Sequence, residues 1–319
     1  MSAPDPIGRA CALLHAGQLV AMPTETVYGL AANARDDAAV ARIYALKGRP
    51  AGHPLIVHLA DVAQLPAWAA EVPELALRLA ARFWPGPLTL ILRRAAGVSD
   101  RVTGGQDTVG LRVPSHPVAQ RLLRAFGDGI AAPSANRYGR VSPTTAAHVR
   151  EEFGAQTPFL LEGGDCEVGL ESTIVSLAGE PLLLRPGGIP QADLEQITGP
   201  LRRAAPGEGP RAPGTTVAHY APATTLSLIA TAALTAGLPT SVAVLARGPA
   251  PAGFGGRLWL EAGTDPQRYA HDLYANLRQL DRAGAGSILV ESVPDTAPWD
   301  AIRDRLARAA AACAAEDLA

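Results

Sequence analysis

The chain has 319 residues and a formal net charge of −2, and 48% of its residues are hydrophobic while 5% are aromatic. That length suffices for one large domain or two ordinary domains with buried cores. A sequence pI of about 6.4 argues against a constitutive nucleic-acid binder, because such proteins usually carry a strongly basic face.

The three cysteines, Cys11, Cys166 and Cys313, lie too far apart for a zinc site built on paired cysteines, and they suit a reducing compartment. The first residues show no apolar run of the secretory type, and the apolar stretch 226–247 is broken near Pro239. We therefore expect a cytoplasmic protein with neither a membrane span nor a metal site of its own.

Hydrophobic periodicity and turn residues divide the first two hundred residues into alternating helices and strands. The expected helices cover 6–16, the segment from the Asp36 or Asp37 cap to about Lys47, 73–83 and 117–126. The expected strands cover 19–22, 54–59, 88–92, 109–113, 130–132, 172–177 and 182–185, and a hairpin turn separates the last two. Because the alternation is not strictly β-α-β, we expect a mixed α/β (α+β) domain around a twisted sheet, spanning residues 1–201.

The composition changes after residue 201. Residues 202–224 are rich in Pro and Gly and predict a linker that is longer than most ordered connections. Residues 225–319 return to a compact pattern and predict a smaller open α/β domain. Its expected strands are 225–229, 241–246, 257–261 and 287–291, and its expected helices are 266–283 and 300–315.

Cationic and hydroxyl side chains stand on short turns beside apolar strands in three places: Pro23–Leu30, Lys47–Pro50 and Ala132–Asn136. Such donors, fixed on loops by a rigid sheet, suit the binding of phosphates and carboxylates. Neither a Gly-x-x-x-x-Gly-Lys-Ser/Thr loop nor a Gly-x-Gly-x-x-Gly turn occurs, so any nucleotide would be held in another way.

Further segments follow these three in a fixed order: Pro54–His58, Phe83–Thr89, Val109–Pro114, Ser142–Thr145, Gly169–Val175 and Leu184–Ile189, and then Pro213-Gly214 and His219–Pro222 in the linker. The ordered set resembles the threonylcarbamoyl-AMP synthase (YrdC-like) family in its long two-domain form. The resemblance implies a twisted α/β domain with a positively charged cavity and a Rossmann-like C-terminal domain. It also implies a nucleotidyltransferase that condenses L-threonine, bicarbonate and Mg²⁺-bearing ATP to threonylcarbamoyl-AMP and pyrophosphate.

The resemblance implies a role for each matching residue. Lys47 and Arg49 would neutralise phosphate charge in catalysis. Arg112 would bind the carboxylate of threonine, because a guanidinium fork matches two oxygens. The other expected threonine contacts are Thr26, His58, the Ala132 carbonyl and Ser172. The expected ATP contacts are Arg49, His53, Thr108, Ser134, Asn136, Ser142, Arg185 and Tyr220, although position 53 is often asparagine in this family.

The resemblance also implies that partner proteins pass the threonylcarbamoyl group to tRNA, and that forming the adenylate requires no tRNA. The linker would act as a lid that keeps water from the reactive mixed anhydride and brings Tyr220 to the nucleotide. A passive tether is the alternative role for the linker.

Three other functions are alternatives. A carbamoyltransferase-like module of hydrogenase maturation would need an acylphosphatase segment and zinc-type cysteines, and the chain has neither. A non-catalytic RNA-binding or ribosome-assembly module is disfavoured by the net charge of −2 and the absence of basic and aromatic stripes. A regulatory amino-acid or nucleotide sensor remains open.

Overall fold

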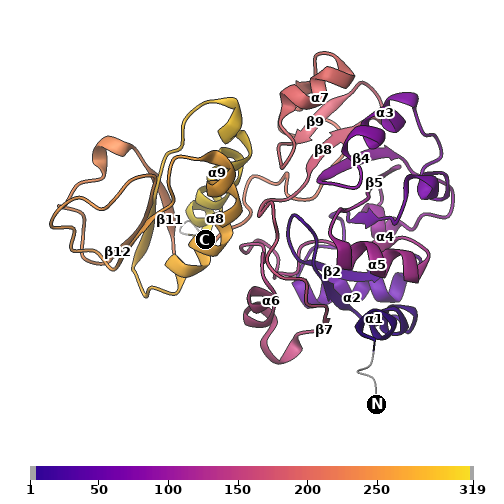
Figure 1. The fold of residues 1–319 in the computed structure, drawn as a ribbon, viewed down its shortest axis with the longest axis horizontal. Coiled ribbons are helices and arrows are strands. Elements are labelled where there is room, and N and C mark those ends of the chain that lie inside the picture. The colour runs from indigo at the N-terminus through magenta and orange to yellow at the C-terminus, as the bar shows by residue number, and fades with distance from the viewer. Residues whose placement is uncertain (1–4, 317–319) are drawn as a thin grey trace. The chain divides into compact units, whose positions relative to one another are not determined.

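The computed structural model describes residues 5–316, whose path is traced in Figure 1. The described chain forms two compact units. Unit 1 extends to Thr215, except that Tyr138–Ser142 and Val168–Leu170 belong to unit 2 together with the residues from Thr216 onward. The outer ends of the two predicted domains, 1–4 and 317–319, lie outside the described residues. The division at residues 201 and 224 stays a prediction.

Unit 1 is built on a ten-stranded mixed sheet with the order β10-β9-β8-β4-β5-β3-β6-β2-β1-β7. Its strands are β1 (Val20–Met22), β2 (Gly29–Asn33), β3 (Ile56–His58), β4 (Leu88–Arg93), β5 (Thr108–Arg112), β6 (Ile130–Ala131), β7 (Phe159–Leu160), β8 (Thr173–Ser176), β9 (Leu182–Arg185) and β10 (Arg202–Arg203). Parallel pairs such as β3–β5 and β4–β8 alternate with antiparallel pairs such as β4–β5. The expected mixed sheet is confirmed, and β8 and β9 form the expected antiparallel pair.

The helices of unit 1 are α1 (Pro6–His15), α2 (Asp37–Lys47), α3 (Glu74–Phe83), α4 (Asp100–Thr103), α5 (Pro117–Phe126), α6 (Ala146–Phe153) and α7 (Gln191–Thr198). Helix α2 shows why its ends fall where they do. The Asp36 carboxylate accepts hydrogen bonds from the first free N–H groups, and Gly48 ends the helix with a left-handed φ of 61°. This ending places Lys47 in the last turn, directly before the Gly-Arg-Pro segment.

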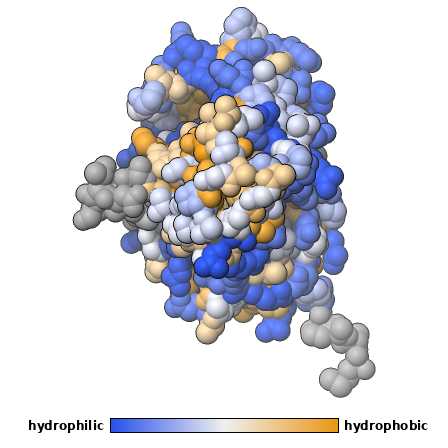
Figure 2. Space-filling model, turned by 90° about the vertical axis from the view of Figure 1, so that its left-hand side faces the viewer, coloured by the Kyte–Doolittle hydropathy of each residue, from blue (hydrophilic) through white to orange (hydrophobic). Residues whose placement is uncertain are grey.

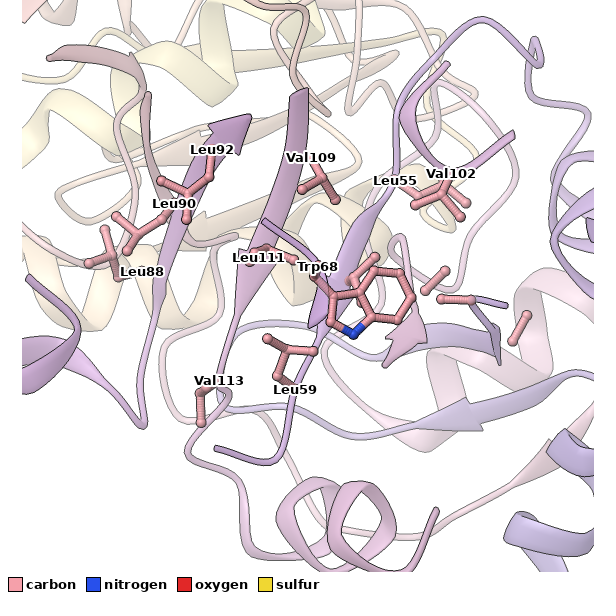
Figure 3. Packing of buried hydrophobic residues seen from close by; sticks show 14 of the residues in the cluster. Leu55, Leu59, Trp68, Leu88, Leu90, Leu92, Val102, Val109, Leu111 and Val113 are labelled. Carbon is pink, nitrogen blue, oxygen red and sulfur yellow. The ribbon is translucent and has the colours of Figure 1, made fainter. Parts of the chain in front are cut away.

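The core of unit 1 lies on one face of the central strands, and Figure 3 shows Leu59 and Leu111 beside Trp68, with Leu88, Leu90 and Leu92 following one another along β4. Successive side chains of a strand point to opposite faces. The core face takes the residues Leu55, Val57, Leu59, Leu88, Leu90, Leu92, Val109, Leu111 and Val113. The alternate positions of the same strands must face the other way, and they include Ile56, His58, Thr89, Ile91, Thr108, Gly110 and Arg112.

Unit 2 contains a four-stranded, wholly parallel sheet with the order β11-β14-β12-β13. Its elements are β11 (Leu226–Ile229), β12 (Val242–Ala246), β13 (Leu258–Glu261), α8 (Pro266–Asp281), β14 (Ser287–Glu291) and α9 (Asp300–Glu316). The expected small open α/β domain is confirmed. No described helix is long and apolar enough to cross a membrane.

One face of unit 2 carries little charge. Figure 2 shows apolar and weakly polar residues gathered on the face that is turned toward the viewer. Among residues 230–256, Arg247 is the only charged residue.

Candidate functional site

Of the predicted site residues, His58, Thr108 and Arg112 lie on the face of the central strands that is opposite the core. The parallel register of β3 and β5 pairs His58 with Arg112. Both side chains are buried, with 3% and 4% exposure. Burial, and secondarily the charge of Arg112, lower the pKa of His58 to about 3. The imidazole is therefore uncharged near neutral pH, and Arg112 supplies the positive charge of this pair.

Arg112 binds the Pro23–Leu30 loop through its guanidinium. Its Nη1 donates to Thr26 Oγ1 at 2.9 Å, its Nη2 to Glu25 Oε1 at 2.6 Å and its Nε to the Gly86 carbonyl at 3.2 Å. The second oxygen of Glu25 accepts from the backbone N–H of Ser115 at 3.1 Å. The structure thus brings Thr26 and Arg112 together, as the sequence predicts, and adds a buried carboxylate that the sequence analysis did not assign.

A second group, on β4, β8 and β9, surrounds Ser172. The Ser172 hydroxyl lies 2.8 Å from Thr89 Oγ1 and accepts from Arg185 Nη2 at 3.1 Å. Arg185 also donates to the Ser172 carbonyl and, through Nη1, to the Pro213 carbonyl at 2.8 Å. The hydroxyl expected to contact threonine and a guanidinium expected to contact ATP are therefore direct neighbours.

A third group connects α2 with the Ala132–Asn136 turn. The Lys47 ammonium donates to the carbonyls of Ser134, at 2.5 Å, and of Asn136. Burial, and secondarily the charge of Arg49, hold the pKa of Lys47 well below its ordinary value. Two of the three ammonium donors are thus used to fix the turn, which leaves one for a ligand.

The Ala132–Asn136 turn also contacts the Pro23–Leu30 loop. Leu30 N donates to the Pro133 carbonyl at 2.7 Å, and Ala135 N donates to the Tyr28 carbonyl at 2.8 Å. Ala132 N donates to the carbonyl of Ile56 on β3 at 3.0 Å. The turn is therefore fastened by its backbone on both sides, and Ala132 lies at the strand that carries His58.

Arg49, His53 and Thr108 lie on the side of the sheet near residues 211–213. Arg49 Nη2 donates to the Pro54 carbonyl at 2.9 Å. Burial and the charges of Arg49 and Arg211 lower the pKa of His53. A hollow here is lined by Pro54, Leu55, Ile56, Ile91, Gln106, Thr108, Gly110, Arg211 and Pro213.

The first part of the predicted linker belongs to unit 1. Strand β10 pairs with β9, and Ala212 packs in one cluster with Ile56 and Ile91. The Gln106 side chain accepts from Arg211 N at 2.7 Å and donates to the Arg211 carbonyl at 3.1 Å. Residues 211–213 are thus fastened over the face that carries the predicted site.

Two of the predicted ATP contacts, Ser142 and Tyr220, belong to unit 2. Ser142 is fully buried, and Tyr220 has a left-handed φ of 65° and contacts the rings of His219 and Tyr274. A left-handed tyrosine is a conformation that only surrounding contacts can maintain. Contacts of Ser142 and Tyr220 with a nucleotide stay predictions.

Sequence reasoning missed several residues of this region. Glu25 lies in the Pro23–Leu30 segment, and no role was predicted for it, although an acidic residue among cations suggests an ion pair. Thr89 likewise received no role. Gly187 was missed because its importance is steric: an added Cβ would lie 2.4 Å from both Glu171 O and Thr173 N.

Comparisons with known proteins agree with these features. A family model described as telomere recombination (Sua5, YciO and YrdC) matches residues 12–187, and one described as the C-terminal domain of threonylcarbamoyl-AMP synthase matches residues 189–311. The chain is 40% identical over 314 residues to a threonylcarbamoyl-AMP synthase of Pyrococcus abyssi, with 94% of this chain and 92% of that one covered. It is 41% identical to the Bacillus subtilis protein of the same name, with 97% and 94% covered.

A solved structure shows the same fold. The crystal structure of P. abyssi Sua5 complexed with L-threonine superimposes with a TM-score of 0.88 at 38% identity, and the match covers 96% of this chain and 94% of that one.

Proposed function

This chain belongs to the threonylcarbamoyl-AMP synthase family, and we propose which of its residues bind the substrates and which neutralise charge during the reaction. The protein is an enzyme that condenses L-threonine, bicarbonate and ATP to threonylcarbamoyl-AMP and pyrophosphate. The match along nearly the whole chain favours this function over a non-catalytic RNA-binding module. The observation that most supports the proposed roles is the buried contact of Arg112 with Thr26 on the face opposite the core.

We assign the threonine carboxylate to Arg112. A guanidinium has five N–H donors, and the three hydrogen bonds to Gly86, Thr26 and Glu25 leave one donor on each terminal nitrogen. Two such donors match the two oxygens of a carboxylate. Thr26, His58, the Ala132 carbonyl and Ser172 are the further contacts proposed for threonine. The uncharged His58 can accept or donate one hydrogen bond without adding charge.

The proposed reaction requires residues that position the substrates and neutralise phosphoryl charge, and it requires no nucleophilic side chain. The threonine amine condenses with bicarbonate to a carbamate and releases water, and a carbamate oxygen then attacks the α-phosphorus of ATP while pyrophosphate leaves. Negative charge gathers on the phosphoryl oxygens during this step. We propose that Arg49 and the remaining donor of Lys47 neutralise this charge, with Ser134 and Asn136 on the turn that Lys47 holds.

The remaining nucleotide contacts are proposed for His53, Thr108, Ser142, Arg185 and Tyr220. Within residues 5–316, no group of three or more His, Cys, Asp or Glu side chains is arranged to hold a metal ion. Mg²⁺ usually keeps several waters and is held largely by substrate phosphates. We therefore propose that Mg²⁺ comes with ATP, bound to its phosphates.

The linker, residues 202–224, is proposed to act as a lid on the catalytic domain 1–201. The contacts of Arg211 and Pro213 with Gln106 and Arg185 support this role for its first part. A covered site would slow the hydrolysis of the mixed anhydride. The product would then pass to tRNA-modifying proteins, and the cytoplasm is the compartment proposed for this work.

Replacing Lys47 or Arg49 with alanine tests the phosphate assignment. The assay is mass spectrometry of the small-molecule product formed from threonine, bicarbonate and ATP. We expect both variants to lose about 90% or more of the product, since one neutralised phosphoryl charge is worth several kcal/mol in the transition state. Turnover at the wild-type rate in both variants would refute the assignment.

A further inference from the structure

Glu25 is the residue that most needs an explanation at this site. It is 2% exposed, and its two oxygens bind Arg112, the last residue of β5, and the backbone N–H of Ser115 in the loop that follows. A carboxylate is a costly group to bury unless it is paired. It also cancels the charge of the guanidinium that is proposed to attract the substrate's carboxylate. A site built only for anion affinity would omit it.

The hydrogen-bond directions around Thr26 show what the neighbouring hydroxyl can offer. Thr24 Oγ1 donates its single proton to the Val27 carbonyl at 2.6 Å. Thr24 Oγ1 also accepts from the backbone N–H groups of Thr26 and Val27, each at 3.2 Å, and lies 2.9 Å from Thr26 Oγ1. The Thr26 hydroxyl accepts from Arg112 with one of its two lone pairs. Its second lone pair can accept a hydrogen bond from an amine or a hydroxyl of a ligand.

The charges of this subsite therefore add up to zero. Arg112 and Glu25 form an ion pair with 4% and 3% side-chain exposure, and burial together with Arg112 keeps His58 uncharged. A zwitterionic amino acid is also neutral overall, and it carries both signs. Its carboxylate meets the two remaining Arg112 donors, while its ammonium meets the Thr26 lone pair and the negative potential of Glu25. A simple carboxylate meets the same donors but is repelled by Glu25 without compensation.

We propose that Glu25 is a specificity-determining positioning residue, which holds and neutralises Arg112 so that the subsite takes an α-amino acid in preference to a simple carboxylate. This inference rests on the proposed function, because it requires that Arg112 bind the carboxylate of threonine. Selection operates here by repulsion of the wrong ligand as much as by attraction of the right one.

The test compares two ligands that differ only in the amine. L-threonine and 3-hydroxybutyrate share the carboxylate, the hydroxyl and the methyl group, and 3-hydroxybutyrate lacks the amine. Calorimetric Kd values for both are measured on the full-length wild type and on Glu25→Gln. Glu25→Gln should lower the preference for threonine by about tenfold, which corresponds to about 1.4 kcal/mol. Removing the negative charge relieves the repulsion of 3-hydroxybutyrate and weakens the attraction of the ammonium.

Two further variants distinguish the effect of the Glu25 charge on ligand binding from the effect of its side-chain length. Glu25→Asp keeps a carboxylate but shortens its reach, so it should weaken both ligands and change their ratio by less than about twofold. Glu162→Gln removes an equal charge from the surface, where Glu162 has 60% side-chain exposure, and should change neither Kd. If Glu25 had only a structural role, each Glu25 variant would weaken both ligands equally.

The inference is overturned if Glu25→Gln retains the wild-type ratio, or if Glu25→Asp lowers the ratio as much as Glu25→Gln does. Should Glu25→Gln fail to fold, Glu25→Met, which also removes the charge and keeps the length of the side chain, is held to the same prediction for the ratio. A failure of the proposed function gives a different result: the wild type itself would bind no threonine and release no pyrophosphate in its presence.

Discussion

At the scale of single residues, the cations proposed for the site are buried and already bonded to the protein. Arg112 is fixed by Glu25 and Thr26, and Lys47 by two backbone carbonyls. Such preorganised groups need little reorganisation when charge develops on a substrate. Their cost is desolvation, which is visible in the lowered pKa of Lys47.

Lys47→Met retains the length of the side chain and removes its charge and donors. The Ser134 and Asn136 carbonyls lose a partner, so the free energy of unfolding should fall by no more than about 3 kcal/mol, offset by the burial of one charge fewer. Pyrophosphate release should fall by about a hundredfold or more. The control is Arg101→Met, which removes a cation with 53% side-chain exposure. Normal turnover in Lys47→Met would mean that the ammonium serves only the fold.

His58 should make stability depend on pH. Its folded pKa of about 3 lies below the unfolded value of about 6.5. The unfolded chain therefore binds the proton first, and the contribution of His58 to stability, full above pH 6.5, is lost as the pH falls toward 3. Urea unfolding of the wild type and His58→Asn should show the stability difference shrinking by about 2 kcal/mol between pH 7 and pH 5. A difference that is the same at both pH values would contradict a buried, uncharged imidazole.

At the scale of elements, strand alternation separates the core from the site. One set of positions on β3, β4 and β5 forms the core, and the alternate set carries His58, Thr89 and Arg112. The site is therefore as rigid as the sheet, and the loops that complete it are tied to the sheet by backbone hydrogen bonds.

Gly187→Ala tests how closely the loops must fit. The added Cβ would approach the backbone of Glu171 and Thr173 to 2.4 Å, so Ser172 must move. We expect the KM for threonine to rise about tenfold or more, with a loss of stability of about 1–3 kcal/mol. Gly179→Ala is the matched control, because a Cβ added at Gly179 would have no neighbour within 4 Å. Wild-type KM values in Gly187→Ala would show that the backbone near Ser172 can shift to accept the added Cβ without affecting threonine binding.

The sequence predicted the elements with strong periodicity well. The helix expected over 117–126 is confirmed as α5, and all four strands of unit 2 lie within a residue of their expected bounds. Short elements without a periodic signal were missed, among them β2, β7, α6 and α7. Elements of two to five residues, or helices with weak apolar faces, are stabilised by tertiary contacts that local pattern does not reveal.

The cations and hydroxyls proposed for the candidate site were identified from the order of the motifs, and their roles stay predictions. Their partners were not predictable to the same degree. That Glu25 would neutralise Arg112, or that Lys47 would donate to two carbonyls, depends on the three-dimensional path of two loops. Strand registers and loop conformations of this kind arise from packing between distant segments, so the sequence alone leaves them open.

At the scale of the whole molecule, two units of different architecture lie on one chain, and the predicted lid belongs partly to each. Residues up to Thr215 belong to unit 1, whereas Tyr220 belongs to unit 2. A lid of this kind would couple closure over the site to the rest of the chain.

Gln106→Leu tests the lid through its attachment to unit 1. The change removes both hydrogen bonds between Gln106 and the Arg211 backbone. The yield of intact threonylcarbamoyl-AMP per ATP consumed should fall by about half or more, because water reaches the anhydride. The control is Gln64→Leu, which removes two similar bonds to the backbone of Ala60 and Gly127. Equal yields in the two variants would favour a passive tether.

The most direct test of the account is pyrophosphate release from ATP by the purified full-length chain, in the absence of any RNA. We predict release that requires both L-threonine and bicarbonate, with threonylcarbamoyl-AMP identified by mass spectrometry, and its near-complete loss in Arg112→Ala. Release that is independent of threonine, or that persists undiminished in Arg112→Ala, would contradict the account.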